Sequence, residues 1–151
     1  MMAGRFQFRL RALEQLRAAT RDEARGRLAE ALRADDVLLA QQRELAMELQ
    51  SLHANAGTPE TGGSLDVDRL VAAARYEIVL RAEQQAITQR QAALATEIDQ
   101  RRAALLVADR ELRTIEKLRE RQQARHLAHE LREETKSLDE AGSRCRIGDD
   151  S

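Results

Sequence analysis

A heptad repeat runs without a break from Leu70 to Ile115 and constrains the fold more than any other feature. Its apolar positions follow one another by steps of three and four residues: Leu70, Ala73, Leu80, Ile87, Leu94, Ile98, Leu105, Ala108, Leu112 and Ile115. Only Glu77, Gln84, Gln91 and Arg101 interrupt this stripe. A period of 3.5 residues keeps one narrow apolar seam facing a partner helix, so the segment predicts a coiled coil. Because a coiled coil encloses no enzyme pocket, we expect the function to lie in what it binds.

The composition favours long helices over a layered globular fold. Charged residues make up 34% of the 151 residues and aromatic residues 2%, and aromatic side chains supply much of the buried area of a globular core. The net charge of −1 gives the chain no overall electrostatic attraction to nucleic acid or anionic lipid. Eight arginines nevertheless gather in residues 1–33, against four acidic residues. This end is either a solvated helix surface or a docking end for an acidic protein partner.

The sequence carries no sign of secretion or of a membrane span. Its single cysteine, Cys145, lies in a polar tail and cannot form an internal disulfide. No apolar run approaches the roughly 18 residues that cross a bilayer, and the N-terminus lacks the apolar stretch of a signal peptide. We therefore expect a cytoplasmic protein with no direct membrane insertion.

One stretch, residues 55–64, breaks the helical pattern, because it holds the only proline and three of the seven glycines. It separates a helix predicted over about residues 5–53 from a second helix predicted over about 66–141. The connector is placed at 54–65, with Ser64 or Asp66 as the N-cap of the second helix. Gly142 is expected to be the C-cap, followed by a flexible tail at 142–151. The whole chain, 1–151, is predicted to be a single coiled-coil domain.

The first helix has a seam of its own, which its later half shows most clearly: Leu28, Ala31, Asp35, Leu38, Gln42, Leu45, Leu49 and Leu52. An earlier apolar set falls out of phase with it: Phe6, Leu10, Leu13 and Leu16. This slip predicts a stutter near residues 17–24, where the coil would unwind locally.

The short connector allows the two helices to fold back on each other. We therefore predict an all-α fold in which two long helices form an antiparallel coiled-coil hairpin, with a parallel homodimer as the alternative. Pairing outward from the connector predicts three neighbours across the seam: Leu52 with Val67, Gln42 with Glu77, and Phe6 with Leu112 or Ile115.

In this register the longer second helix overhangs its partner from about Leu118 onward. The overhang keeps four leucines that have no partner within the hairpin: Leu118, Leu127, Leu131 and Leu138. Such a stripe either binds another protein or frays in isolation, and a segment that orders only when bound does both.

No group of residues predicts catalysis, a cofactor or a metal. His126 and His129 lie near Glu130, but the His-Glu-x-x-His order of zinc proteases is missing and an overhanging helix offers no burial. Acidic residues alternate with Arg and Lys at helical spacing, which solubilises a helix rather than building an acid–base pair. The sequence also contains no glycine-rich phosphate loop and no aromatic platform for nucleic acid.

Four short motifs follow one another along the chain: RFQFRLRAL at residues 5–13, RYEIVL at 75–80, IEKLRER at 115–121 and ELREETKSLDE at 130–140. In kind, order and position they resemble motifs of the FliJ family, small soluble components of the flagellar type III export apparatus. The resemblance covers nearly the whole chain. This chain departs from some members in carrying few aromatic residues on its first helix.

The resemblance implies a non-enzymatic flagellar export factor that resembles the central stalk of rotary ATPases. Its implied partners are the export ATPase and its regulator, the export gate and export chaperones, at the cytoplasmic face of the inner membrane at the flagellar base. Tyr76 and Leu80 would face the gate, although seam packing is the alternative role for both. The ATPase contact would involve Phe6, Phe8, Glu116, Lys117, Leu118, Leu138, Asp139 and Glu140. A virulence-type secretion stalk and a purely structural scaffold stay open as alternative functions.

Overall fold

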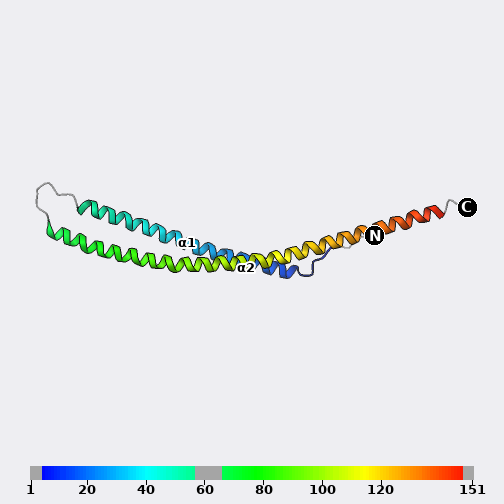
Figure 1. Cartoon of the computed structure of the whole chain (residues 1–151), viewed down its shortest axis with the longest axis horizontal. Helices are drawn as coiled ribbons and strands as arrows, with labels where there is room; N and C mark the ends of the chain where they lie inside the picture. Colours follow the sequence, from blue (N-terminus) through cyan, green and yellow to red (C-terminus); the bar gives the residue numbers. More distant parts are fainter. Residues whose placement is uncertain (1–4, 57–65, 148–151) are drawn as a thin grey trace. The chain divides into compact units, whose positions relative to one another are not determined.

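The computed structural model describes residues 5–56 and 66–147, and within them the chain forms two long α-helices and no strand (Figure 1). Helix α1 spans Arg11–Ala56 and helix α2 spans Val67–Ile147. These helices confirm the predicted all-α hairpin. At the start of α2, the Asp66 carboxylate accepts hydrogen bonds from the backbone N–H groups of Asp68 (3.1 Å) and Arg69 (3.4 Å). Asp66 is thus the N-cap, and Ser64 lies outside the described residues.

The helix ends differ from those predicted at two places. Helix α1 begins at Arg11 rather than near residue 5, with the backbone N–H of Arg11 donating to the carbonyl of Phe8 at 3.2 Å. Helix α2 continues to Ile147, so Gly142 lies inside it and is not its C-cap. One glycine costs a helix about 1 kcal/mol relative to alanine, which is too little to end a helix by itself.

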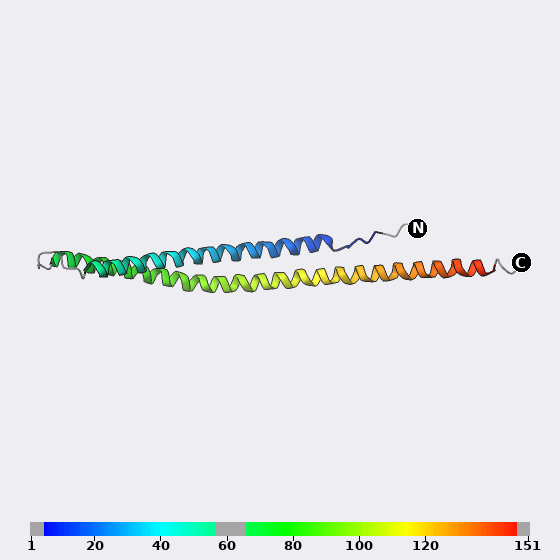
Figure 2. The ribbon, with the colours of Figure 1, turned by 90° about the horizontal axis from the view of Figure 1, so that it is seen from above.

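The chain divides into two compact units, a central unit of residues 23–105 and a terminal unit of residues 1–22 and 106–151. In the central unit, α1 from residue 23 onward runs antiparallel beside α2, as Figures 1 and 2 show in cyan and green. Whether the chain acts as a single domain stays a prediction.

The core of the central unit is the predicted seam. Leu45, Leu80 and Ile87 form its buried cluster, and Leu80 is only 2% exposed. Three more leucines pack against this cluster: Leu38, Leu49 and Leu52. The other seam positions of α2 from Ala73 to Leu105 are all at least half-buried, in unbroken steps of three and four residues. This pattern follows the heptad predicted from the sequence.

The register across this seam corrects the prediction. Gln42 does not face Glu77; the side chain of Gln91 donates a hydrogen bond to that of Gln42 at 3.2 Å, and Glu77 instead pairs with His53 at 3.3 Å. Gln91 lies 14 residues, or two heptads, beyond Glu77. Leu52 likewise packs against the central cluster, while Val67 is 66% exposed. A shift by whole heptads keeps every seam residue facing the partner, so periodicity alone does not fix the register.

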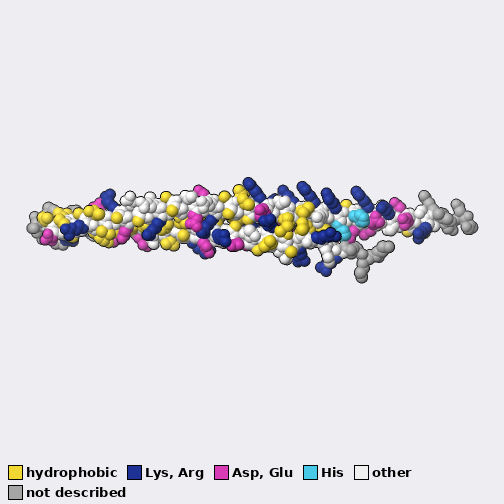
Figure 3. Space-filling model, turned by 90° about the horizontal axis from the view of Figure 1, so that it is seen from below, with side chains coloured by type: hydrophobic (Ala, Val, Ile, Leu, Met, Phe, Trp, Pro, Cys, Tyr) yellow, Lys and Arg dark blue, Asp and Glu magenta, His cyan; other side chains and the backbone are white. Residues whose placement is uncertain are grey.

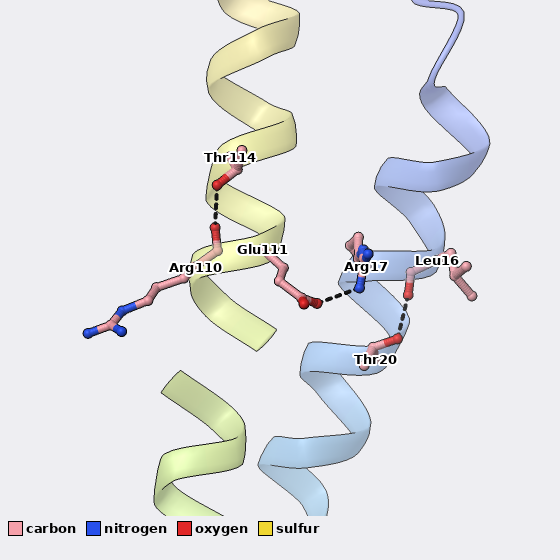
Figure 4. A network of polar contacts seen from close by, with 6 residues as sticks. All are labelled: Leu16, Arg17, Thr20, Arg110, Glu111 and Thr114. Atoms are coloured by element: carbon pink, nitrogen blue, oxygen red, sulfur yellow. Dashed lines mark hydrogen bonds and ion pairs between the residues drawn. The ribbon is translucent and has the colours of Figure 1, made fainter. Parts of the chain in front are cut away.

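The terminal unit pairs the first turns of α1 with α2 through charged side chains. Arg17 forms an ion pair with Glu111 (Figure 4), and Arg119 lies 2.7 Å from the Glu14 carboxylate, whose side chain is only 15% exposed. Leu112 is buried beside them, at 5% exposure. The seam here therefore combines ion pairs with buried apolar side chains.

The stutter predicted in α1 is absent, because charged residues occupy the seam positions near the start of this helix. Glu14, Arg17, Arg21 and Ala24 are half-buried and continue to Leu28 in steps of three and four, whereas Leu16 is 62% exposed. The heptad of α1 is unbroken, and charged residues occupy the positions where an apolar residue was expected. An apolar pattern alone cannot detect such positions.

The N-terminal segment is displaced from its predicted place. Phe6 lies against His126, with the ring centroids 5.6 Å apart, and not against Leu112 or Ile115. His126 is again two heptads beyond Leu112, so the register shift reaches this unit as well. Phe6 thus contacts α2 beyond Leu118, and all described side chains of residues 131–145 are exposed, while the overhang itself stays a prediction.

No helix within residues 5–56 and 66–147 combines the length and the apolarity needed to cross a membrane.

The buried position of Leu80 gives a test of the seam. Replacing Leu80 by Ala should lower the free energy of unfolding by about 2–4 kcal/mol, because it removes buried contacts and leaves a cavity. Ile78→Ala is the matched control, since Ile78 is 68% exposed on the same helix and should change stability by less than about 0.5 kcal/mol. Urea unfolding followed by circular dichroism measures both values. Equal losses for the two variants would contradict the seam.

Candidate partner-binding surfaces

The described residues of the central unit present open grooves rather than an enclosed pocket. Two shallow grooves follow the line where α1 and α2 meet, and both are lined in part by Arg90. One has both polar and apolar walls, with Glu44, Glu48 and Glu83 among its lining, and the other is largely apolar. Neither encloses a volume in which a reacting group would be shielded from water.

Tyr76 bridges the two helices of the central unit. Its ring is on α2 and is 44% exposed, and its hydroxyl donates a hydrogen bond to the Glu48 carboxylate on α1. This hydrogen bond, together with partial burial and the negative charges of Glu48 and Glu83, raises the pKa of Tyr76 above its ordinary value of 10.0. Tyr76 is thus held in a fixed position while much of its ring stays accessible.

Leu80 lies in a different environment from Tyr76, although the two are one helical turn apart. Leu80 is buried in the seam, where it contributes to packing. The exposed apolar side chains next to it are Ile78 and Val79, at 68% and 51% exposure. Sequence reasoning missed these two residues, although their positions outside the heptad could have identified them as surface residues.

Phe6 and Phe8 anchor the N-terminal segment in the terminal unit. Both side chains are half-buried, and the ring of Phe6 packs on that of His126 at an interplanar angle of 33°. His126 also lies 3.2 Å from the Glu130 carboxylate. These contacts hold the segment before α1 along α2. In the part of the chain that the structure describes, no three His, Cys, Asp or Glu side chains are grouped as metal ligands.

The remaining predicted contact residues lie on α2 in two separate groups. Glu116 is half-buried, while Lys117 and Leu118 are exposed. The second group, Leu138, Asp139 and Glu140, is fully on the surface, with Leu138 at 71% exposure. The groups are 22 residues apart, or about 33 Å along a helix, so one small partner surface cannot cover both.

These features define the class of protein: an all-α coiled-coil hairpin whose accessible side chains lie on the outer faces of its helices. A protein-family model described as "Flagellar FliJ protein" matches residues 6–149. The chain therefore belongs to the FliJ family, as the four motifs predicted, and the family implies a part in flagellar assembly and type III export. No curated protein and no solved structure matches the chain.

The raised pKa of Tyr76 is testable because Tyr76 is the only tyrosine and the chain has no tryptophan. Tyrosinate absorbance should show a pKa above 10.0, and Glu48→Gln should lower it toward 10.0 by removing the charged acceptor. Since the folded chain holds this proton more tightly than the unfolded chain, the contact stabilises the fold below pH 10 and is lost as the pH rises through the raised pKa.

Glu44→Gln is the control, because Glu44 lines the same groove and is not among the groups that shift Tyr76. Identical titration curves for the unmodified protein and Glu48→Gln would contradict the contact.

Proposed function

We propose that this protein is a non-enzymatic export factor of the flagellar type III system. It acts as a stalk-like coiled coil that binds the export ATPase ring and its regulator, the export gate and export chaperones. Its place is at the cytoplasmic face of the inner membrane at the flagellar base. The observation that carries the proposal is the family match over residues 6–149, together with the fold of two long helices.

The exposed residues of the central unit supply the gate contact in this proposal. Tyr76 presents part of its ring, and Ile78 and Val79 add exposed apolar area on the same helix. Leu80 acts as a positioning residue, because its burial in the seam fixes the orientation of the turn that carries Tyr76. Aromatic and aliphatic anchors of this kind supply most of the energy of protein interfaces.

The ATPase contact in this proposal uses the terminal unit. Lys117 and Leu118 are exposed on α2, as are Leu138, Asp139 and Glu140. Phe6 packs on His126 of the same helix and Phe8 is half-buried, so in this proposal both act by positioning the basic N-terminal segment. The long exposed stretch of residues 131–145 gives the partner access to all sides of α2 there.

Purified protein should raise the activity of its cognate flagellar export ATPase in a saturable manner. The variant Leu138→Ala/Asp139→Ala/Glu140→Ala should require at least about tenfold more protein for the same stimulation, because it loses an apolar anchor and two charges from the contact. Helical melting should not change, since all three side chains are exposed. Steady-state phosphate release at increasing protein concentration measures the effect.

Met47→Ala serves as the control, because Met47 is 64% exposed on α1 in the central unit and lies outside the proposed contact. No stimulation at saturating protein would contradict the proposal. Stimulation of an injectisome ATPase but not of the flagellar one would instead support the virulence-type alternative.

A further inference from the structure

A row of six cations occupies one exposed face of α2 in the terminal unit. The row consists of Arg110, Arg113, Lys117, Arg121, Arg125 and Arg132, which we call the basic row. Successive members are three, four, four, four and seven residues apart, so they share one side of the helix. All six are exposed, and dark blue side chains stand out along one edge of the space-filling view in Figure 3. The row extends over 22 residues, or about 33 Å.

The basic row faces away from the seam. Figure 4 shows the Arg110 side chain pointing away from α1, while its neighbour Glu111 points toward Arg17. Arg119, which is not part of the row, pairs with Glu14 across the seam. The pairing of α1 with α2 therefore leaves the row uncovered.

No carboxylate neutralises the basic row within the described residues, where none of its six members takes part in an ion pair. Asp109, Glu116 and Glu120 lie to one side of it, while Glu111 and Glu133, which follow Arg110 and Arg132 in the chain, pair with Arg17 and Lys136 instead. Like charges four residues apart repel each other and weaken a helix by a few tenths of a kcal/mol per pair. An anionic partner along the whole row would turn this repulsion into attraction.

The residues between the cations indicate which kind of anion fits. Those on the centre line of the row are small, as at Thr114, Ala124 and Ala128, while the exposed Leu118, Leu127 and Leu131 lie toward its edges, so the centre of the row has no large apolar anchor of the kind that protein interfaces need. It also carries no aromatic ring on which the bases of single-stranded RNA could stack. A layer of anionic phospholipid headgroups requires neither, because it attracts a row of four to eight basic side chains by charge alone.

We propose that the basic row docks α2 on an anionic phospholipid surface, with the helix lying along the headgroups and not inserted between the acyl chains. This deepens the membrane-peripheral location in the proposed function by naming a direct lipid contact. The row shares Lys117 with the proposed ATPase contact, so the test uses members of the row that lie outside that contact. The net charge of −1 conceals this surface, because acidic side chains elsewhere offset the row.

The test is sedimentation of the purified full-length protein with vesicles. The protein should bind vesicles of phosphatidylglycerol and phosphatidylethanolamine, should not bind phosphatidylcholine vesicles, and should dissociate at about 1 M salt, where charge attraction is screened over about 3 Å. Arg113→Gln/Arg121→Gln/Arg125→Gln should weaken binding about 100-fold, since each basic residue near such a surface contributes about a fivefold factor. These three residues lie outside the proposed ATPase contact.

A matched control removes three exposed charges from the central unit: Arg33→Gln/Arg43→Gln/Arg75→Gln. It should bind vesicles within about threefold of the unmodified protein, because these residues lie outside the row. Arg113→Lys/Arg121→Lys/Arg125→Lys should also retain binding, because adsorption requires charge and not the guanidinium geometry. Circular dichroism melting confirms that each variant folds.

Three results would overturn the proposal. The first is equal binding to the anionic and phosphatidylcholine vesicles, and the second is equal binding by the basic-row variant and its control. The third is tighter binding to poly-uridine RNA or poly-glutamate than to anionic vesicles, lost in the basic-row variant, which would assign the row to that macromolecule. None of these results involves the export ATPase, so the proposed function is tested separately.

Discussion

The narrow seam shared by the two helices is the constraint on which the rest of the structure depends. Each helix is charged over most of its circumference, so neither has a second apolar face on which to build a layered core. Leu80 and Ile87 are buried because α1 supplies Leu45 and its neighbours opposite them. A helix with only one such stripe gains most of its stability from packing that stripe against a partner. The same geometry leaves every other face available for binding.

The chemistry of the seam differs between the two units. In the central unit, leucines and isoleucines are buried together, and burial of each large side chain contributes about 1.5–3 kcal/mol. In the terminal unit, the buried Ala108 and Leu112 are accompanied by ion pairs such as that of Arg17 with Glu111, whose side chains remain about 40% exposed. Exposed pairs of this kind contribute only about 0.2–1 kcal/mol each. The terminal unit is therefore the part in which a binding partner can most easily compete with the contacts within the chain.

The sequence predicted the elements of the fold better than their alignment. The two helices and most seam positions follow from periodicity, because a 3.5-residue repeat places the apolar residues of each helix on one face, whatever the register of the partner helix. The register was wrong by two heptads, since Gln42 faces equally well toward Glu77 or Gln91 in a periodic pattern. The stutter was wrong because Glu14 and Arg17 occupy seam positions that hydrophobicity does not reveal.

For the candidate surfaces too, features set by the local sequence could be predicted, whereas contacts that depend on how the two helices pair could not. Tyr76 and Leu138 are exposed, and their partner roles stay predictions, whereas Leu80 is buried in the core. The contact of Phe6 with His126 could not be predicted, because it depends on the register. The basic row could have been found from its spacing in the sequence, but its lack of partners required the structure.

The central claim, that the two helices pair within one chain in this register, is tested most directly by cross-linking. In a Cys145→Ser background, Gln42→Cys/Gln91→Cys should react with a short thiol-specific cross-linker to give a product at the mass of one chain, 17.0 kDa. Gln42→Cys/Glu77→Cys should not, because Glu77 is about 21 Å further along α2 from Gln91. Cross-linking of the second pair, or a product only at twice the mass of one chain, would contradict the intramolecular seam.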